Sequence, residues 1–415
     1  MVIKIKTNIL YQILLAICLA VPYLGSYELT FFIWSFTVFI TLHNKYSLSF
    51  IKYLLCFILI LLLAFFSTKL EADNLFFIIR DITYLLKPII GLLLGYQICK
   101  YNFNNLFGKI INIGFYISII HLSFLLFSVV YHQAYTVNEL RFYGGYFSDF
   151  EIYALIIVLF HEKFQIQLTR KKYYLMAFII GLSSFMYLSR GNIIQFVVLF
   201  LALKGYFKLT KRALIAIFSV IGLVLISYSV IFYINPKRNG KGLEALLYKI
   251  KIAPIEPFKN KINTADYIDF NDNYRSVETI NTIKQVNNNG TKSMIFGSGL
   301  GSKVDLKRDV YLGDMKMRYI SVLHNAFMTT YLKSGILGVL LLIYSFYLLY
   351  KQPKEMTYIN QNINNLLIGT AVFLVISNWV LMGYYFTEDS KSILVGLLFA
   401  FKEINKKNEN KKSLI

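Results

Sequence analysis

Apolar runs long enough to cross a membrane recur from one end of this sequence to the other. A helix needs roughly 20 apolar residues to cross about 30 Å of hydrocarbon, where each backbone polar group must be paired within the protein. Twelve such runs occur, at residues 8–24, 28–42, 48–67, 75–97, 108–131, 149–167, 173–189, 191–207, 213–234, 324–350, 365–386 and 390–402. The sequence therefore predicts an all-α polytopic membrane protein with about 12 transmembrane helices.

The composition agrees with this fold class. Of 415 residues, 57% are hydrophobic and 17% aromatic, and the mean hydropathy of +0.55 lies far outside the range of soluble globular proteins. Cys18, Cys56 and Cys99 all lie in or at the ends of apolar runs. The sequence therefore predicts neither a disulfide framework nor a zinc site.

The basic residues predict the orientation. If the amino terminus is cytoplasmic, alternate short connections carry most of the charge, at Lys45, Lys100, Lys109, Lys163, Arg170 to Lys172, Lys204 to Arg212, Lys351, Lys354 and from Lys402 onward. The short connections on the other side hold only Lys69, Arg141, Arg190 and Lys391. This asymmetry places both termini in the cytoplasm. It also explains most of the net charge of +21, so we expect no nucleic acid partner.

The runs divide the chain into four parts. These are helices 1–9 at 1–234, an extracytoplasmic loop domain at 235–323, helices 10–12 at 324–402, and a basic cytoplasmic tail at 403–415. Apolar periodicity within the loop domain predicts helices over 242–252 and 273–286, the second starting at Ser276, and a turn-rich loop over 287–301. The polar composition of the tail predicts disorder.

Ionisable residues inside an apolar run are functional candidates, because a charge in hydrocarbon costs about 2.5–3.5 kcal/mol on insertion scales. The fourth run contains Arg80, Asp81 and Lys87. Arg80 lies close to the outer end of this run and Lys87 lies deeper. The alternative interpretation is that these charges form ion pairs that only hold helices together.

Several arginines are expected on the outer face. Arg141 and Arg190 lie in short outer connections, where few basic residues occur. The loop domain adds Arg275, Arg308 and Arg318. Each guanidinium can bind two oxygens of one anion, so their convergence predicts a site for a phosphate-rich ligand. The alternative for Arg141 and Arg190 is contact with lipid headgroups.

His324 opens the tenth run and is one of five histidines. The positive end of a helix lowers the pKa of an imidazole, which favours the neutral form that accepts a proton. The alternative is a histidine that only caps the helix. The nearby stretch Phe296 to Ser302 (FGSGLGS) lacks the Lys-Ser/Thr ending of a nucleotide-binding P-loop.

An ordered set of short motifs resembles the O-antigen ligase/polymerase superfamily of lipid-linked glycan enzymes. The matching residues are Arg141 with Gly144, Ser189 to Gly191, Gly297, Gly299 and Gly301, His324 and Asn325, and Gly335 and Gly338. In that family a large outer loop precedes a span that opens with His-Asn. This chain departs from the family at Lys333, where many members carry an acidic residue.

The resemblance implies a helical bundle like that of GT-C glycosyltransferases. It also implies an inverting glycosyl transfer at the outer face of the bacterial cytoplasmic membrane, without metal or other cofactor. The donor would be an oligosaccharide on a polyprenyl pyrophosphate. We expect Arg141 and Arg190 to neutralise the leaving diphosphate and His324 to orient or deprotonate the acceptor hydroxyl. Further substrate-binding residues would be Arg80, Arg275, Arg318, Asn325, Gly299 and Gly301.

Three functions are compatible with this resemblance. A polymerase would join repeat units of an O-antigen, capsule or exopolysaccharide, with a chain-length regulator and a flippase as further partners. A ligase would move finished glycan to lipid A core or protein. A lipid-linked oligosaccharide flippase is less favoured, since the sequence shows one interrupted span, at Lys87-Pro88, rather than a pair. We favour the polymerase, because the loop-domain sequence is individual and polymerases differ with each glycan.

Overall fold

The computed structural model of the chain describes residues 7–70, 74–101, 105–207, 211–238, 243–252, 256, 259, 261–312, 315–351 and 357–412. A helix covers part of each predicted apolar run. These helices are α1 Thr7–Ala20, α2 Tyr27–Ile40, α3 Leu48–Phe66, α4 Leu75–Lys100, α5 Leu106–His132, α7 Asp149–Leu159, α8 Arg170–Met186, α9 Arg190–Leu203, α10 Lys211–Ile234, α15 Ala326–Tyr350, α16 Tyr358–Val380 and α17 Lys391–Lys412.

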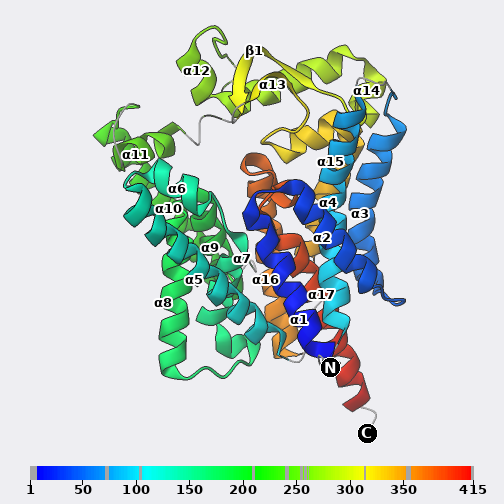
Figure 1. Cartoon of the computed structure of the whole chain (residues 1–415), viewed down its shortest axis with the longest axis vertical. Coiled ribbons are helices and arrows are strands. Elements are labelled where there is room, and N and C mark those ends of the chain that lie inside the picture. The colour runs from blue at the N-terminus through cyan, green and yellow to red at the C-terminus, as the bar shows by residue number, and fades with distance from the viewer. Residues whose placement is uncertain are drawn as a thin grey trace.

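The remaining elements are short. They are α6 Val137–Gly144, α11 Leu243–Ile252, α12 Tyr267–Asp272, α13 Tyr274–Asn288, α14 Thr291–Phe296, and the strands β1 Val304–Leu312 and β2 Met315–Ile320. Figure 1 shows that α11 to α14 and the strands gather at one end of the helical bundle, and that the carboxyl terminus lies at the opposite end.

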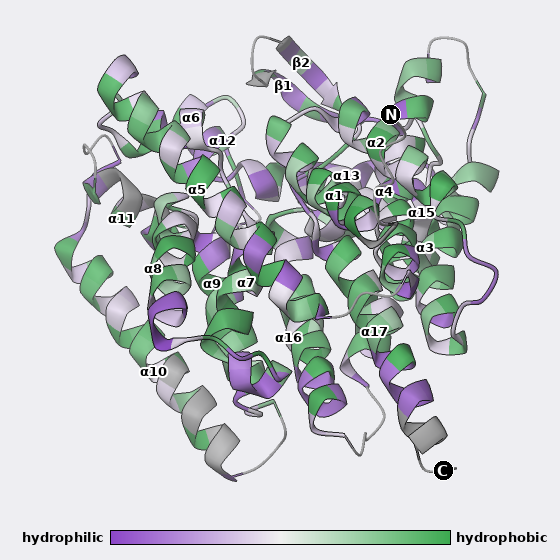
Figure 2. Ribbon diagram, turned by 60° about the horizontal axis from the view of Figure 1, so that its bottom comes forward, coloured by the Kyte–Doolittle hydropathy of each residue, from purple (hydrophilic) through white to green (hydrophobic). Residues whose placement is uncertain are grey.

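The fold is that of a mostly helical membrane protein. Among the described residues, four helices are long and apolar enough to span a membrane, namely α3, α5, α15 and α16. The pair α6 and α7, bent by 91°, would make a fifth. Figure 2 shows apolar residues along the long helices, whereas polar residues are frequent in the strands and at the end of α17. The finer count of about twelve spans stays a prediction.

Two glycines let α4 and α17 pack closely in the middle of the bundle. A Cβ at Gly95 would overlap the carbonyl oxygen of Ile393, and a Cβ at Gly396 would overlap that of Leu92. Small residues allow helix backbones to approach in this way inside membranes. The contact holds the first half of the chain against its carboxyl-terminal helix.

The loop domain differs from the all-helical expectation. The strands β1 and β2 form an antiparallel hairpin, with an irregularity between Asp305 and Val310. Apolar and charged residues alternate over residues 304–307 and 315–318, so the strand pattern was present in the sequence but was not used. Helix α14 lies inside the stretch predicted as a loop. Helix α13 begins at Tyr274, and Ser276 is buried rather than at the helix start.

The prediction of a disordered tail is wrong as far as Lys412, because α17 continues to that residue. Glu403 accepts ion pairs from Lys100 at 2.8 Å and from Lys407 at 2.7 Å. The Lys402 ammonium donates to Asn364 at 2.7 Å. These contacts compensate for the low apolar content that suggested disorder.

Candidate anion-binding site

Four arginines line one cleft of about 420 Å³ beside the loop domain. Its lining residues are Arg141, Arg190, Arg238, Tyr248, Ile252, Glu256, Asn271, Asp272 and Arg275. They come from α6, α11 and α12, from the starts of α9 and α13, and from segments outside the helices. Segments far apart in the sequence therefore bring their guanidinium groups together at one place.

The ends of two helices place Arg141 and Arg190. Helix α6 begins with a capping box between Thr136 and Glu139, and it ends at Gly145, whose φ of 97° suits glycine. The Arg141 guanidinium lies 5.1 Å from the ring centre of Tyr146. Arg190 is the first residue of α9 and follows a tight turn at Leu188, where φ is 50°. The charges of Arg141 and Arg275 both act on Arg190.

Carboxylates hold the other two arginines. Arg275 donates to Glu256 at 2.9 Å, and Arg238 donates to both oxygens of Asp272 at 3.0 and 3.1 Å. The Tyr248 hydroxyl also donates to Asp272, at 2.8 Å. Four arginines against two carboxylates leave an excess of two positive charges in the cleft. An excess of positive charge on guanidinium groups suits a phosphate-rich anion.

His324 lies between β2 and α15 and is held by a buried carboxylate. Its backbone N–H donates to Glu278 at 3.0 Å, and its Nδ1 lies 2.9 Å from the other oxygen of that carboxylate. The Glu278 side chain is fully buried, whereas the His324 side chain is 45% exposed. The next residue, Asn325, caps α15 by accepting the N–H of Met328 at 3.2 Å. The imidazole is therefore oriented but remains accessible.

The pKa of His324 is raised, whereas we expected it to be lowered. Burial lowers its pKa, but the hydrogen bond and the negative charge of Glu278 outweigh burial, and the pKa lies above its ordinary value. Glu278, and not the positive end of α15, therefore decides the direction in which the pKa of His324 shifts. The charges of Arg275 and Glu256 also act on the imidazole. The histidine thus lies within electrostatic reach of two residues that line the arginine cleft.

Arg80, Arg308 and Arg318 do not line the cleft. Arg80 donates to the Ser321 hydroxyl, and its guanidinium lies 5.1 Å from the ring centre of Phe77. Arg308 donates to the carbonyl groups of Thr264 and Ala265, both at 3.1 Å. Arg318 lies on the hairpin and donates to both oxygens of Asp305, at 2.8 and 3.1 Å. These hydrogen bonds from Arg318 lower the pKa of Asp305 well below its usual range.

The glycine-rich segment packs against the bundle. The Gly301 N–H donates to Asp81 at 2.7 Å. A Cβ at Gly299 would come within 2.5 Å of the Ser67 carbonyl oxygen, and φ is +83° at Gly299 and +79° at Gly301. These contacts give both glycines a packing role, and neither lines the arginine cleft.

Lys333 forms an ion pair with Asp81. The two charged atoms are 2.5 Å apart, and each side chain is 1% exposed. The same ammonium donates to the Ser302 carbonyl at 2.5 Å. The pair therefore connects α4, the glycine-rich segment and α15. It supports the alternative interpretation of the charges in the fourth run as helix-holding ion pairs.

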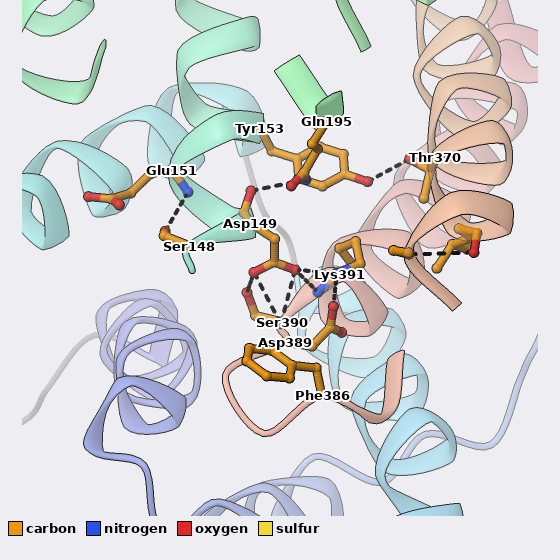
Figure 3. Close-up of polar contacts among 12 residues, drawn as sticks. Ser148, Asp149, Glu151, Tyr153, Gln195, Thr370, Phe386, Asp389, Ser390 and Lys391 are labelled. Atoms are coloured by element: carbon orange, nitrogen blue, oxygen red, sulfur yellow. Dashed lines mark hydrogen bonds and ion pairs between the residues drawn. The ribbon is translucent and has the colours of Figure 1, made fainter. Parts of the chain in front are cut away.

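A second buried cluster of charges surrounds Asp149, the first residue of α7. Its carboxylate accepts the backbone N–H groups of Ser390 at 3.2 Å and Lys391 at 2.9 Å, and the Lys391 ammonium at 3.1 Å. Lys391 also pairs with Asp389. Figure 3 shows Asp149 pointing at the start of α17, where these groups converge. The cluster joins the starts of two helices.

Sequence reasoning missed Arg238, Glu278 and Asp149. Arg238 lies four positions after the end of α10, and Asp149 is the first residue of a predicted span. Both were therefore recognisable as charged residues close to predicted spans. Glu278 had none, because it lies 46 positions before His324. Among the described residues, no group of three His, Cys, Asp or Glu side chains is arranged to hold a metal ion.

The fold and the cleft together define a class, a helical membrane protein with a cleft lined by four arginines. Comparison with known proteins adds no family, because no family model matches the chain and no curated protein or solved structure matches it significantly.

Proposed function

We propose that the protein is a membrane glycosyltransferase that polymerises oligosaccharide repeat units carried on polyprenyl pyrophosphate. The observation that carries this proposal is the cleft shared by Arg141, Arg190, Arg238 and Arg275. Guanidinium groups bind phosphate oxygens in pairs and stabilise charge as it develops on a leaving group. The energy for transfer is already present in the bond between the sugar and the diphosphate.

His324 is the proposed proton acceptor. When its Nδ1–H donates to Glu278, the Nε2 atom carries the lone pair that can accept a proton. The acceptor hydroxyl would lose its proton to Nε2 while its oxygen bonds to the anomeric carbon. The bond from that carbon to the diphosphate breaks, and its electron pair leaves on the diphosphate. Glu278 would stabilise the imidazolium that forms.

The proposed setting is the outer face of the bacterial cytoplasmic membrane. About twelve spans with both termini in the cytoplasm would put the loop domain and the cleft on the outer side. The basic residues in alternate connections support this orientation. A ligase that uses the same donor would need the same cleft, so the polymerase is distinguished from it only by the acceptor.

A flippase for lipid-linked oligosaccharide is a second candidate, and two breaks in helices favour it. Helices α6 and α7 are bent by 91°, and α15 is interrupted at Gly335, whose φ is 64°. Interrupted helices are typical of transporters. The interruption that the sequence predicted at Lys87-Pro88 is absent, because α4 continues through Pro88. A single interrupted span therefore no longer disfavours a flippase. A flippase would bind the same donor without releasing its diphosphate.

The glycan length profile of the host tests these alternatives. We expect deletion of the gene to leave single repeat units attached to the final acceptor, because polymerisation alone is lost. Wild type should restore the ladder, Arg190→Ala should not, and Arg318→Ala should act as the matched control that does. Long chains that remain on the carrier lipid in the deletion would indicate a ligase. Repeat units trapped on the cytoplasmic face would indicate a flippase.

A further inference from the structure

A buried histidine, His121 of α5, connects three helices close to the segments that carry two of the cleft arginines. Its side chain is 5% exposed, and its Nδ1 lies 2.8 Å from the Ser183 hydroxyl of α8. Ser183 donates to Glu151 of α7 at 2.7 Å. A hydroxyl has one proton to donate, so the Nδ1–H of His121 donates to Ser183. This chain of hydrogen bonds fixes the orientation of the imidazole.

Stability alone does not explain a histidine at this position. The other ring nitrogen, Nε2, is buried and has no hydrogen-bond partner among the residues that the structure describes. A buried polar atom that is left unpaired costs free energy. Ser118 of α5 donates to the same Glu151 oxygen at 2.7 Å, so α5 and α7 are already joined without the histidine. The explanation for the imidazole therefore lies in the other contacts of its ring.

The imidazole supports the two segments that carry Arg141 and Arg190. Gly144 ends α6 three residues after Arg141, and a Cβ there would lie 3.0 Å from Nε2 of His121. The imidazole also stacks on Tyr187, with ring centres 3.8 Å apart and an angle of 10° between the ring planes. Tyr187 directly follows α8 and lies three residues before Arg190. One buried ring thus contacts both segments.

We propose that His121 is a positioning residue of the arginine cleft, and that it sets the place of Arg141 relative to Arg190. The inference rests on the proposed function only because that function makes the cleft a diphosphate site. Two guanidinium groups bind one anion well only when the packing around them holds them at the right separation. The inference also explains the glycine at position 144, because a side chain there would press on the imidazole.

Binding of inorganic pyrophosphate to the purified protein in lipid nanodiscs tests this inference, with the midpoint of thermal unfolding measured alongside. His121→Asn keeps a donor for Ser183 but removes the ring. Ser183→Ala keeps the ring but removes the hydrogen bond that orients it. Ser118→Ala is the matched control, because both hydroxyls donate to the same Glu151 oxygen at 2.7 Å and Ser183, unlike Ser118, also bonds His121.

We expect His121→Asn and Ser183→Ala each to weaken pyrophosphate binding by about tenfold, an effect typical of residues coupled through direct contact. Ser118→Ala should bind pyrophosphate like wild type, although it should lower the unfolding midpoint as much as Ser183→Ala does. Either His121→Asn or Ser183→Ala is sufficient for the test if the other does not fold.

A double-mutant cycle with Arg190→Lys identifies the route of the effect. His121→Asn should weaken pyrophosphate binding less in the Arg190→Lys protein than in wild type, because the guanidinium that His121 positions is already absent. A residue with a purely structural role would cause the same loss in both proteins.

Three outcomes would overturn the inference. Unchanged pyrophosphate binding in both His121→Asn and Ser183→Ala would mean that the ring does not position the cleft. Equal weakening by Ser118→Ala and Ser183→Ala would mean that the hydrogen bonds only stabilise the bundle. Losses that add fully in the double variant would mean that His121 does not act through Arg190. The proposed function fails by a different result, namely tight binding of pyrophosphate without any glycosyl transfer, which would leave the role of His121 intact.

Discussion

Glu278 holds His324 at two atoms, because its carboxylate accepts the backbone N–H at 3.0 Å and lies 2.9 Å from Nδ1. This double contact fixes the imidazole relative to the start of α15 and selects the tautomer that has its lone pair on Nε2. It also keeps a negative charge beside the ring. Both effects favour the histidine as a proton acceptor.

The first prediction concerns the pH dependence of glycosyl transfer. His324 accepts a proton only when it is neutral, so kcat/KM should fall as the pH drops through its pKa, which Glu278 raises above the ordinary value. Glu278→Gln removes the negative charge and should move this fall to lower pH. His324→Ala should reduce kcat by about 10²- to 10⁴-fold, the usual contribution of a general base. An identical acid limb in wild type and Glu278→Gln would exclude His324 as the titrating group.

The second prediction compares lysine substitutions at two arginines. Lysine keeps the charge but loses the planar fork, so Arg190→Lys should weaken binding of a polyprenyl pyrophosphate by about tenfold or more. Arg318→Lys is the matched control, because Arg318 lies on the hairpin beside Asp305. Equilibrium binding of labelled polyprenyl pyrophosphate measures both. Equal weakening by the two changes would mean that the cleft has no special role.

The third prediction concerns the buried pair of Asp81 and Lys333. Asp81→Asn leaves a buried ammonium without its counter-charge, and the free energy of unfolding should fall by about 3–5 kcal/mol. The double change Asp81→Asn with Lys333→Met removes both charges and should recover much of that loss. Unfolding in detergent gives the comparison. If the single and double variants were equally unstable, the ion pair would not be the source of the effect.

The fourth prediction concerns the break in α15. Gly335 has a φ of +64°, and a Cβ there would overlap the Ile295 carbonyl oxygen. Gly335→Ala should therefore lower the midpoint of thermal unfolding. Gly222→Ala in α10 is the control, since nothing lies within 4 Å of a Cβ there. The control should be neutral or stabilise the helix by up to about 1 kcal/mol. A stable Gly335→Ala protein would contradict the close approach of α14 and α15.

Local sequence patterns predicted the helices well, because an apolar run has few alternatives to a helix in hydrocarbon. They also brought Arg141, Arg190 and Arg275 together as candidates, and the structure places these three in one cleft. The charge bias was informative because it marks positions where a basic residue is unexpected. The charge bias could not distinguish Arg318 from these three arginines, because its surface ion pair with Asp305 has no signature in the sequence.

Pairings between distant residues could not be predicted from a single sequence. Lys333 had no assigned partner because Asp81 lies in a different helix, and Glu278 gave no sign that it faces His324. Helix α17 continues through a stretch of polar composition because Glu403 and Lys402 find partners on α4 and α16. In each case a tertiary contact decided the outcome and the local propensity did not.

The most direct test of the central claim is transfer by the purified protein supplied only with a polyprenyl-pyrophosphate-linked repeat unit. We predict a ladder of lengthened glycans together with release of free polyprenyl pyrophosphate. Arg190→Ala should abolish this ladder and Arg318→Ala should retain it. No lengthening and no release by folded wild-type protein that binds the donor would contradict the assignment of the cleft as the site of a glycan polymerase.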